Sequence, residues 1–183
     1  MRTFRSRMKP FAAVSEPNQE RTWDYMIGFI ALPHVGGFMG WYSSRYCGPK
    51  WYEHLRKPHW SPNKRTFPIM WSAFYTSMGY ASYLVWNDVK ESSEKALLPL
   101  GLYGIQMVLA WTWVPLFFRA HKIKLALCNM VLLYGTVVAT MIAWYPINRK
   151  AVALMVPYVL WLSVTSSLNY CIWRDNPQRK RRA

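Results

Sequence analysis

The chain has 183 residues, enough for one domain or one small helical bundle. Its net charge of +15 would suggest nucleic acid in a soluble protein, but the sequence has no zinc-finger, RNP-like or basic recognition-helix pattern. Apolar residues make up 52% of the chain, and its 11 Trp are more than a small soluble core buries. Lys and Arg lie almost wholly outside the apolar stretches, so we exclude nucleic-acid binding and attribute the charge to membrane topology and anionic lipid.

The N-terminal segment, residues 1–22, is basic. Arg and Lys come without an acid until Glu16, as in a mitochondrial presequence. Pro10, Pro17 and the absence of a clear amphipathic repeat favour a disordered extension instead. We predict such an extension, followed by a membrane domain over residues 23–176.

Five charge-free windows follow in series. Each is about 20–24 residues long, the length that a helix needs to cross a bilayer. Irregular backbone cannot face lipid, so helices are expected. The sequence therefore predicts an all-α bundle of five transmembrane helices, with spans at about 25–44, 66–87, 96–118, 125–148 and 151–173.

The basic residues predict the orientation. Five spans place the termini on opposite sides of the membrane, and the side with the C-terminus carries 14 of the 23 Lys and Arg. The positive-inside rule puts that side in the cytosol. The basic tail, residues 177–183, is then expected at the cytosolic membrane surface.

The tryptophans fall into two groups by their place in the windows. Those near the window edges are predicted to form an aromatic belt: Trp23, Trp41, Trp86, Trp144 and Trp173. Those further inside are candidates for a pocket that takes a flat, apolar ligand: Trp71, Trp111, Trp113 and Trp161. Ordinary helix packing explains the inner group equally well.

The polar residues inside the spans indicate packing more than catalysis. No acid, Lys or Arg lies within a span, which argues against a proton relay. His34, Gln106, Asn129 and Asn169 are each a candidate ligand contact, but interhelical hydrogen bonding is favoured. The three Cys and four His lack ligand spacing, and no nucleophile–base pair is evident. We predict no metal site, no cofactor and no enzyme activity.

Two local patterns have a physical basis. Leu168, Tyr170 and Arg174 fit the L/V-x-Y-x-K/R pattern proposed for cholesterol contact. A belt Tyr and a snorkelling Arg are the alternative interpretation. Gly36 and Gly40 form a GxxxG pattern that permits close helix approach, either between chains or within one bundle.

Several ordered motifs resemble a known family. Their Trp, Tyr, Pro and Gly residues resemble, in order and spacing, the translocator protein family, also called tryptophan-rich sensory proteins or peripheral benzodiazepine receptors. The similarity covers roughly residues 26–176. The segments that carry it are 51–52, 57–60, 78–86, 99–103, 111–113 and 168–176.

The resemblance implies a five-helix membrane bundle that binds cholesterol, porphyrins or haem, and isoquinoline or benzodiazepine-type ligands, and that is linked to cholesterol movement. It maps sterol recognition onto Leu168, Tyr170 and Arg174, and the porphyrin-linked Trp pair onto Trp71 and Trp161. In animals it implies the mitochondrial outer membrane with a cytosolic C-terminus.

Other segments change these expectations. Residues 31–34, 146–148 and 163–166 resemble the erythroid-type vertebrate branch, which implies the endoplasmic reticulum or plasma membrane. Ala110 stands where many members have Asn, which puts the polar part of the drug and porphyrin pocket in doubt. The small-residue pattern around Gly101, Gly104 and Ile105 is altered, so a homodimer through that face stays open.

The leading functional hypothesis is a membrane protein that binds cholesterol and assists its transport. The first alternative is a porphyrin-degrading or photoprotective tetrapyrrole sensor that uses Trp71 and Trp161. The second is a ligand receptor that reports to partner proteins without moving its ligand.

Overall fold

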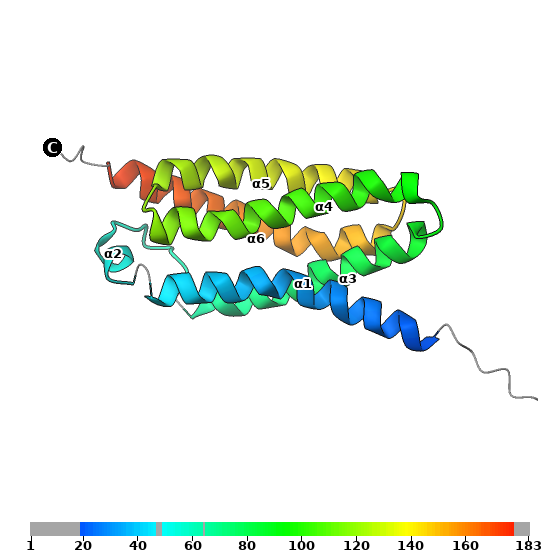
Figure 1. Ribbon diagram of the computed structural model, residues 1–183. Helices are drawn as coiled ribbons and strands as arrows, with labels where there is room; N and C mark the ends of the chain where they lie inside the picture. The colour runs from blue at the N-terminus through cyan, green and yellow to red at the C-terminus, as the bar shows by residue number, and fades with distance from the viewer. Residues whose placement is uncertain (1–18, 47–48, 64, 178–183) are drawn as a thin grey trace, which may run out of the picture.

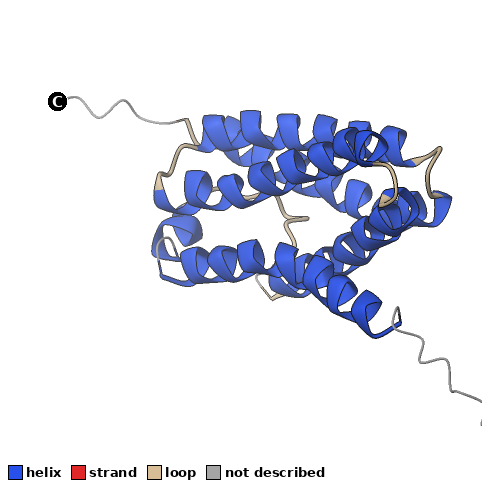
Figure 2. Cartoon of the chain, turned by 45° about the vertical axis from the view of Figure 1, so that its right-hand side comes forward, coloured by secondary structure: helices blue, strands red, loops and turns tan. Residues whose placement is uncertain are grey.

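The computed structural model describes residues 19–46, 49–63 and 65–177, and all regular structure in these ranges is helical (Figures 1 and 2). The all-α prediction is therefore confirmed for the described residues. The elements are α1 (Gln19–Tyr46), α2 (Pro49–His54), α3 (Thr66–Val89), α4 (Ser93–Val114), a π-helical segment η1 (Pro115–Arg119), α5 (Ile123–Trp144) and α6 (Arg149–Asp175).

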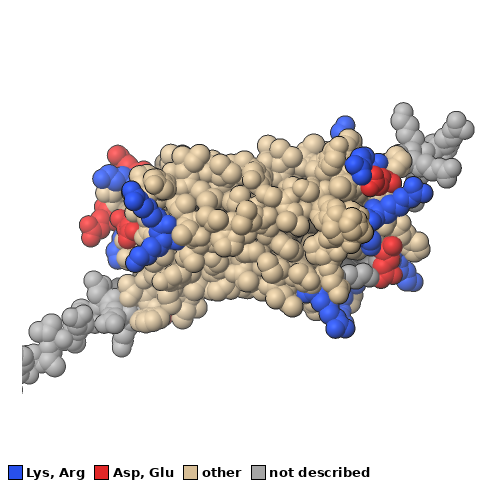
Figure 3. Space-filling view, turned by 180° about the vertical axis from the view of Figure 1, so that it is seen from behind, with Lys and Arg blue, Asp and Glu red and all other residues tan. Residues whose placement is uncertain are grey.

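The five long helices follow the five charge-free windows. They run lengthwise beside one another, while the short helix α2 lies at the end of the bundle where α6 finishes (Figure 1). α1 begins at the opposite end. On the face shown in Figure 3, Lys, Arg, Asp and Glu gather at the two ends and leave an uncharged belt between them.

Three of the helices are long and apolar enough to cross a membrane: Glu94–Arg119, Ile123–Trp144 and Arg149–Asp175. The first of these combines α4 with η1. α1 and α3 are as long, but α1 includes Asp24 and Arg45 near its ends, and α3 is rich in Tyr, Ser and Trp, which lower its hydropathy. Of the five predicted spans, three are therefore supported by the length and composition of their helices.

Two predicted segments lie largely outside the described residues. The extension predicted for 1–22 falls there as far as residue 18, and residues 19–22 are the first turn of α1. Of the tail predicted for 177–183, the structure describes Pro177.

The helices pack in a closed order around the bundle: α1, α3, α6, α5, α4 and back to α1. The main core lies between α3, α4, α5 and α6 and includes the fully buried Met78, Leu133 and Leu162. A smaller apolar cluster around Phe117 and Ile172 lies at the α2 end. α1 makes its principal contact with α3, at Gly79.

Trp144 corrects one part of the aromatic-belt interpretation. The side chain is 0% exposed, and its indole Nε1 donates to the Pro99 carbonyl oxygen at 3.1 Å. It is a core residue that joins α5 to α4, so it does not anchor the bundle at a membrane surface. Trp23, Trp41 and Trp173 are exposed, as belt residues would be.

Candidate ligand cavity

A cavity of about 730 Å³ lies in the half of the bundle nearest α2. It is bounded by α1, α3, α4, η1, α5 and α6, with Tyr52 of α2 at one edge. Most of its lining is apolar. The lining residues are His34, Gly36, Gly37, Phe38, Gly40, Trp41, Arg45, Tyr52, Arg65, Phe67, Pro68, Trp71, Ser72, Tyr75, Ala110, Trp113, Val114, Phe117, Phe118, Met130, Leu133, Thr165, Leu168, Asn169 and Ile172.

Glycines on α1 shape one wall of this cavity. A Cβ on Gly36 would overlap the Trp111 ring, and one on Gly37 would lie 3.0 Å from Tyr75 Cε2. A Cβ on Gly40 would be 3.4 Å from Val114 Cγ2. The GxxxG pair, Gly36 and Gly40, therefore brings α1 close to α4 within one bundle, which matches the intramolecular alternative. Gly37 brings α1 close to α3.

The rim of the cavity is basic and aromatic. Arg45 and Arg65 are exposed residues among its lining. Tyr52 is half-buried, and burial raises the pKa of its phenol, an effect that a hydrogen bond with Ser61 opposes. Lys57 Nζ lies 4.2 Å from the centre of the Tyr52 ring and donates to the Tyr52 carbonyl oxygen at 2.9 Å.

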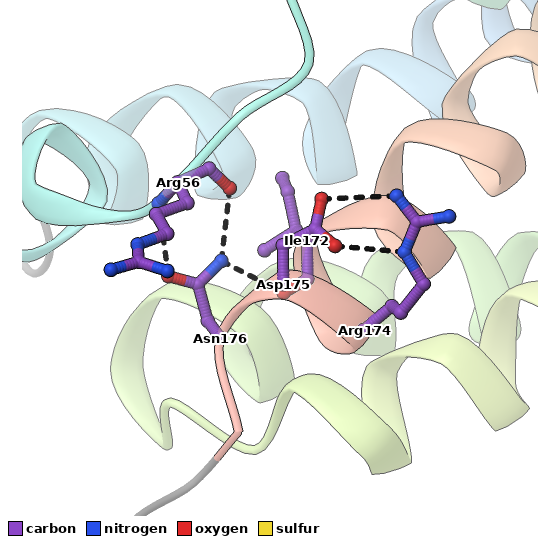
Figure 4. Close-up of polar contacts among 5 residues, drawn as sticks. All are labelled: Arg56, Ile172, Arg174, Asp175 and Asn176. Carbon is purple, nitrogen blue, oxygen red and sulfur yellow. Dashed lines mark hydrogen bonds and ion pairs between the residues drawn. The ribbon is translucent and has the colours of Figure 1, made fainter.

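Asn176 ties the connection between α2 and α3 to the end of α6 (Figure 4). Its Oδ1 accepts from the Arg56 backbone N–H and its Nδ2 donates to the Arg56 carbonyl oxygen, both at 2.9 Å. The same Nδ2 also donates to the Ile172 carbonyl oxygen at 2.9 Å. Asn176 thus caps the end of α6. Its side chain also pairs with the backbone N–H and carbonyl of Arg56, as a neighbouring backbone segment would, and so holds the connection beside the cavity rim.

α2 is held in place by aromatic contacts with η1 and the turn after it. The Trp51 ring lies 5.5 Å from Phe117 and 4.3 Å from His121. His121 has a φ of 53°, the left-handed conformation that a tight reversal before α5 requires. The sequence reasoning assigned no role to Trp51, Tyr52 or Asn176, although aromatic residues in a charged connection were a visible signal.

The structure brings two of the four predicted pocket tryptophans to the cavity. Trp71 and Trp113 line it, whereas Trp111 and Trp161 do not. Trp111 packs against Gly36 of α1. Trp161 lies beside Phe67 and Phe74, with ring centres 5.8 and 6.1 Å apart.

The three residues of the predicted sterol pattern do not share one face of α6. Leu168 is 4% exposed and lines the cavity, while Tyr170 is 47% exposed. Arg174 is also exposed, and its Nε donates to Asp175 Oδ1 at 2.7 Å (Figure 4). An α-helix turns about 100° per residue, so Tyr170 lies about 200° around the axis from Leu168 and about 40° from Arg174.

Three of the four polar span residues make the expected interhelical hydrogen bonds. Asn129 Nδ2 donates to the Leu109 carbonyl oxygen at 2.9 Å, and Gln106 Nε2 to the Met78 sulfur at 3.3 Å. His34 Nε2 pairs with the Thr76 hydroxyl at 3.3 Å. The side-chain amide of the fourth, Asn169, has no hydrogen-bond partner among the described residues.

Groups of three or more His, Cys, Asp or Glu that could hold a metal ion do not occur within the described ranges. Cys128 and Cys171 are free thiols. Cys128 is exposed on the bundle surface, although it lies inside an apolar stretch of the sequence. Cys47 lies outside the described residues.

Comparison with known proteins places these features in context. Residues 29–174 match the TspO/MBR family. The translocator protein of Sus scrofa is 42% identical over 158 residues, 86% of this chain and 94% of its own length. Translocator protein 2 of Homo sapiens is 44% identical over 149 residues, 81% of this chain and 88% of its own. The protein CrtK of Rhodobacter capsulatus is 33% identical over 130 residues, 71% and 81% of the two chains.

Proposed function

The chain belongs to the TspO/MBR family and is a membrane protein, and we propose that it binds cholesterol and assists its transport within the membrane. The observation that carries the proposal is the cavity of about 730 Å³ lined by Leu168, Trp71 and Trp113. Pockets for drug-sized ligands commonly measure about 300–1,000 Å³ and are mostly apolar. A flat, rigid hydrocarbon with few polar groups suits such a lining.

The geometry of α6 divides the predicted sterol pattern into two contacts. A sterol in the cavity would meet Leu168, whereas a sterol on the outer surface would meet Tyr170 and Arg174. One molecule does not reach both sides of a helix at the same height. The proposal therefore assigns Leu168 to the cavity and Tyr170 with Arg174 to an outer, lipid-facing contact.

Porphyrins or haem and drug-like aromatic molecules are the second ligand class of the proposal. Trp71 and Trp113 are aromatic residues of the lining, and such molecules can pack against them. Trp161 is not among the lining residues, so a reaction that uses Trp71 and Trp161 together has no support from the cavity. We propose binding without enzymatic turnover.

The proposed topology has five crossings, with the C-terminus in the cytosol. The uncharged belt of the bundle supports it (Figure 3), as does the position of α1's start opposite α6's end. The mitochondrial outer membrane is the proposed location, with the endoplasmic reticulum or plasma membrane as the alternative. Proteins named translocator protein and translocator protein 2 are similarly close to this chain, at 42% and 44% identity.

Filling the cavity tests the proposal. Ala110 is 3% exposed and lines the cavity, so Ala110→Phe would occupy space that a ligand needs. The full chain in membranes would be labelled with a photoactivatable cholesterol, with and without excess cholesterol as competitor. We expect Ala110→Phe to reduce competitor-sensitive labelling about tenfold, a change that corresponds to about 1.4 kcal/mol of binding free energy.

Ala153→Phe is the matched control because Ala153 is exposed on the outer side of α6. The same substitution there adds the same ring to the surface and leaves the cavity open. Labelling should stay at the wild-type level. Equal labelling of wild type and Ala110→Phe would show that the sterol does not occupy the cavity.

A further inference from the structure

Asn169 is a buried amide whose hydrogen-bonding capacity is unused. It is 2% exposed on the inner face of α6, and neither its Nδ2 nor its Oδ1 has a hydrogen-bond partner among the described residues. Buried amides in proteins are nearly always paired, because an unpaired one loses its hydration without compensation. Asn129 on α5 is also buried and follows that rule, because its Nδ2 donates to the Leu109 carbonyl oxygen.

The position of Asn169 indicates a partner for its unpaired amide, namely a ligand in the cavity. It lies between Leu168 and Ile172 in the lining of the cavity. Its carboxamide has one acceptor and two donors, and both polar atoms are buried beside a space whose lining is mostly hydrocarbon. A group with this chemistry, in this place, is available to a ligand.

Two other polar residues of the lining, Thr165 and His34, are already engaged. The Thr165 hydroxyl donates to the Trp161 and Leu162 carbonyl oxygens of its own helix. His34 Nδ1 is within 2.9 Å of the Ile30 carbonyl oxygen, and its Nε2 pairs with Thr76. The Trp113 indole N–H is a second buried donor without a partner among the described residues, and it also lines the cavity.

We infer that Asn169 is the hydrogen-bonding anchor of the cavity, and that its ligand is a mainly apolar molecule whose hydroxyl or carbonyl group points inward to this amide. The inference rests on the proposed function and makes it more specific. For a sterol, it places the ring hydroxyl inside the bundle and away from Arg174. The remaining rings would then lie along the apolar lining formed by residues such as Leu168 and Trp71.

The test removes the hydroxyl and the amide separately and together. Cholesterol and cholest-5-ene, which lacks the hydroxyl, compete for labelling by photoactivatable cholesterol on the purified full chain in lipid nanodiscs. Wild type should prefer cholesterol about tenfold, the effect of one well-made buried hydrogen bond. In Asn169→Leu and Asn169→Ala the two sterols should bind equally, because cholesterol alone loses affinity.

Asn87→Leu, the same substitution at an exposed position of α3, is the control, and it should keep the wild-type preference. Arg174→Leu tests recognition of the hydroxyl at the outer surface. If both Asn169 variants keep the preference, the anchor assignment is wrong, although sterol binding itself stands. If Arg174→Leu removes it, the hydroxyl is read outside the bundle and the inference is also wrong. Failure of either sterol to compete in wild type would overturn the proposed function and the inference with it.

Unfolding temperatures, measured with and without cholesterol, distinguish a purely structural role of Asn169 from ligand binding. Because Asn169→Leu replaces an unpaired amide by a side chain of similar volume, sterol-free protein should unfold at the same or a higher temperature. Added cholesterol should raise the unfolding temperature of wild type more than that of the variant. A lower unfolding temperature of the sterol-free variant, with equal shifts on adding cholesterol, would assign Asn169 to the fold and not to the ligand.

Discussion

Trp144 shows at the scale of one residue how a polar atom inside the bundle is satisfied. Pro99 lies inside α4 and Trp144 at the end of α5, and the Trp144 indole N–H donates to the Pro99 carbonyl oxygen at 3.1 Å. The side chain also packs against Tyr103, with ring centres 5.6 Å apart. The contact therefore combines burial of a large ring with one directional bond between two helices.

Replacing this indole should destabilise the bundle. Trp144→Phe removes the donor, leaves the Pro99 carbonyl without that partner and creates unfilled space. We expect the free energy of unfolding in detergent to fall by about 2–4 kcal/mol from the lost bond and the lost packing together. Thermal or denaturant unfolding would measure it.

Trp173→Phe is the control for the same chemical change at an exposed position of α6. It should alter the unfolding free energy by no more than about 0.5 kcal/mol, as is usual for surface substitutions. If the two variants lose comparable unfolding free energy, Trp144 contributes no more to the core than an exposed belt residue does.

Trp144 and Trp173 also show which properties of a single residue the sequence can predict. Both lie at the edge of a charge-free window, and distance from a charge indicates depth along a helix. It does not indicate which face of the helix a residue occupies, because that depends on the neighbouring helices. The same limit explains why Trp71 and Trp113 reach the cavity while Trp111 and Trp161 pack elsewhere.

At the scale of helices, α1 and α3 are in close backbone contact at Gly79. A Cβ at this position would lie 2.5 Å from Ile30 Cα and 2.6 Å from the Phe29 carbonyl oxygen. Both neighbours are backbone atoms, which cannot move aside as a flexible side chain can. The pair depends on the missing side chain, in the way that small residues promote close packing of membrane helices.

Gly79→Ala should therefore separate α1 from α3. Overpacking of this kind costs about 1–3 kcal/mol, and we expect a loss in this range in thermal unfolding. Because α1 forms one wall of the cavity, labelling by photoactivatable cholesterol should fall as well.

Gly135→Ala provides the matched control. A Cβ there would meet nothing within 4 Å, and the residue is exposed in the middle of α5. Alanine in place of a helical glycine should be neutral or stabilise by up to about 1 kcal/mol. If Gly79→Ala behaves in the same way, the helices are not in backbone contact.

Sequence patterns predicted the long helices well and the irregular segments poorly. The charge-free windows lie within a few residues of α3, α5 and α6 because charged residues flank apolar helices in a membrane protein. The π-helical segment that begins at Pro115 was not predicted, since it arises where the chain turns towards α5. Neither was the short helix α2, whose position is fixed by contacts with Phe117 and His121.

At the scale of the whole molecule, the bundle is a closed ring of five helices with charge at both ends. α1 and α3 are less apolar than the other three, but they complete the ring between α4 and α6. The cavity exists because all five contribute to its walls. If α1 and α3 lay outside the membrane, the cavity would be open on the side that these two helices form. Their backbone contact at Gly79 would then lie in water and not in the membrane.

The number of crossings can be tested at two exposed positions, Asn63 before α3 and Glu91 after it. With five crossings these residues lie on opposite sides of the membrane, Asn63 on the side of the C-terminus. If only α4 with η1, α5 and α6 cross, α3 stays on one side, and Asn63 and Glu91 face the same compartment.

Single-cysteine variants Asn63→Cys and Glu91→Cys, made in a chain whose three native Cys are replaced by Ala, distinguish these arrangements. In intact organelles, a membrane-impermeant maleimide should label Asn63→Cys at once and Glu91→Cys only after the membrane is permeabilised. Equal labelling of the two before permeabilisation would refute the five-helix crossing, and the reverse pattern would keep it but invert the orientation that the positive charge at the α2 end predicts.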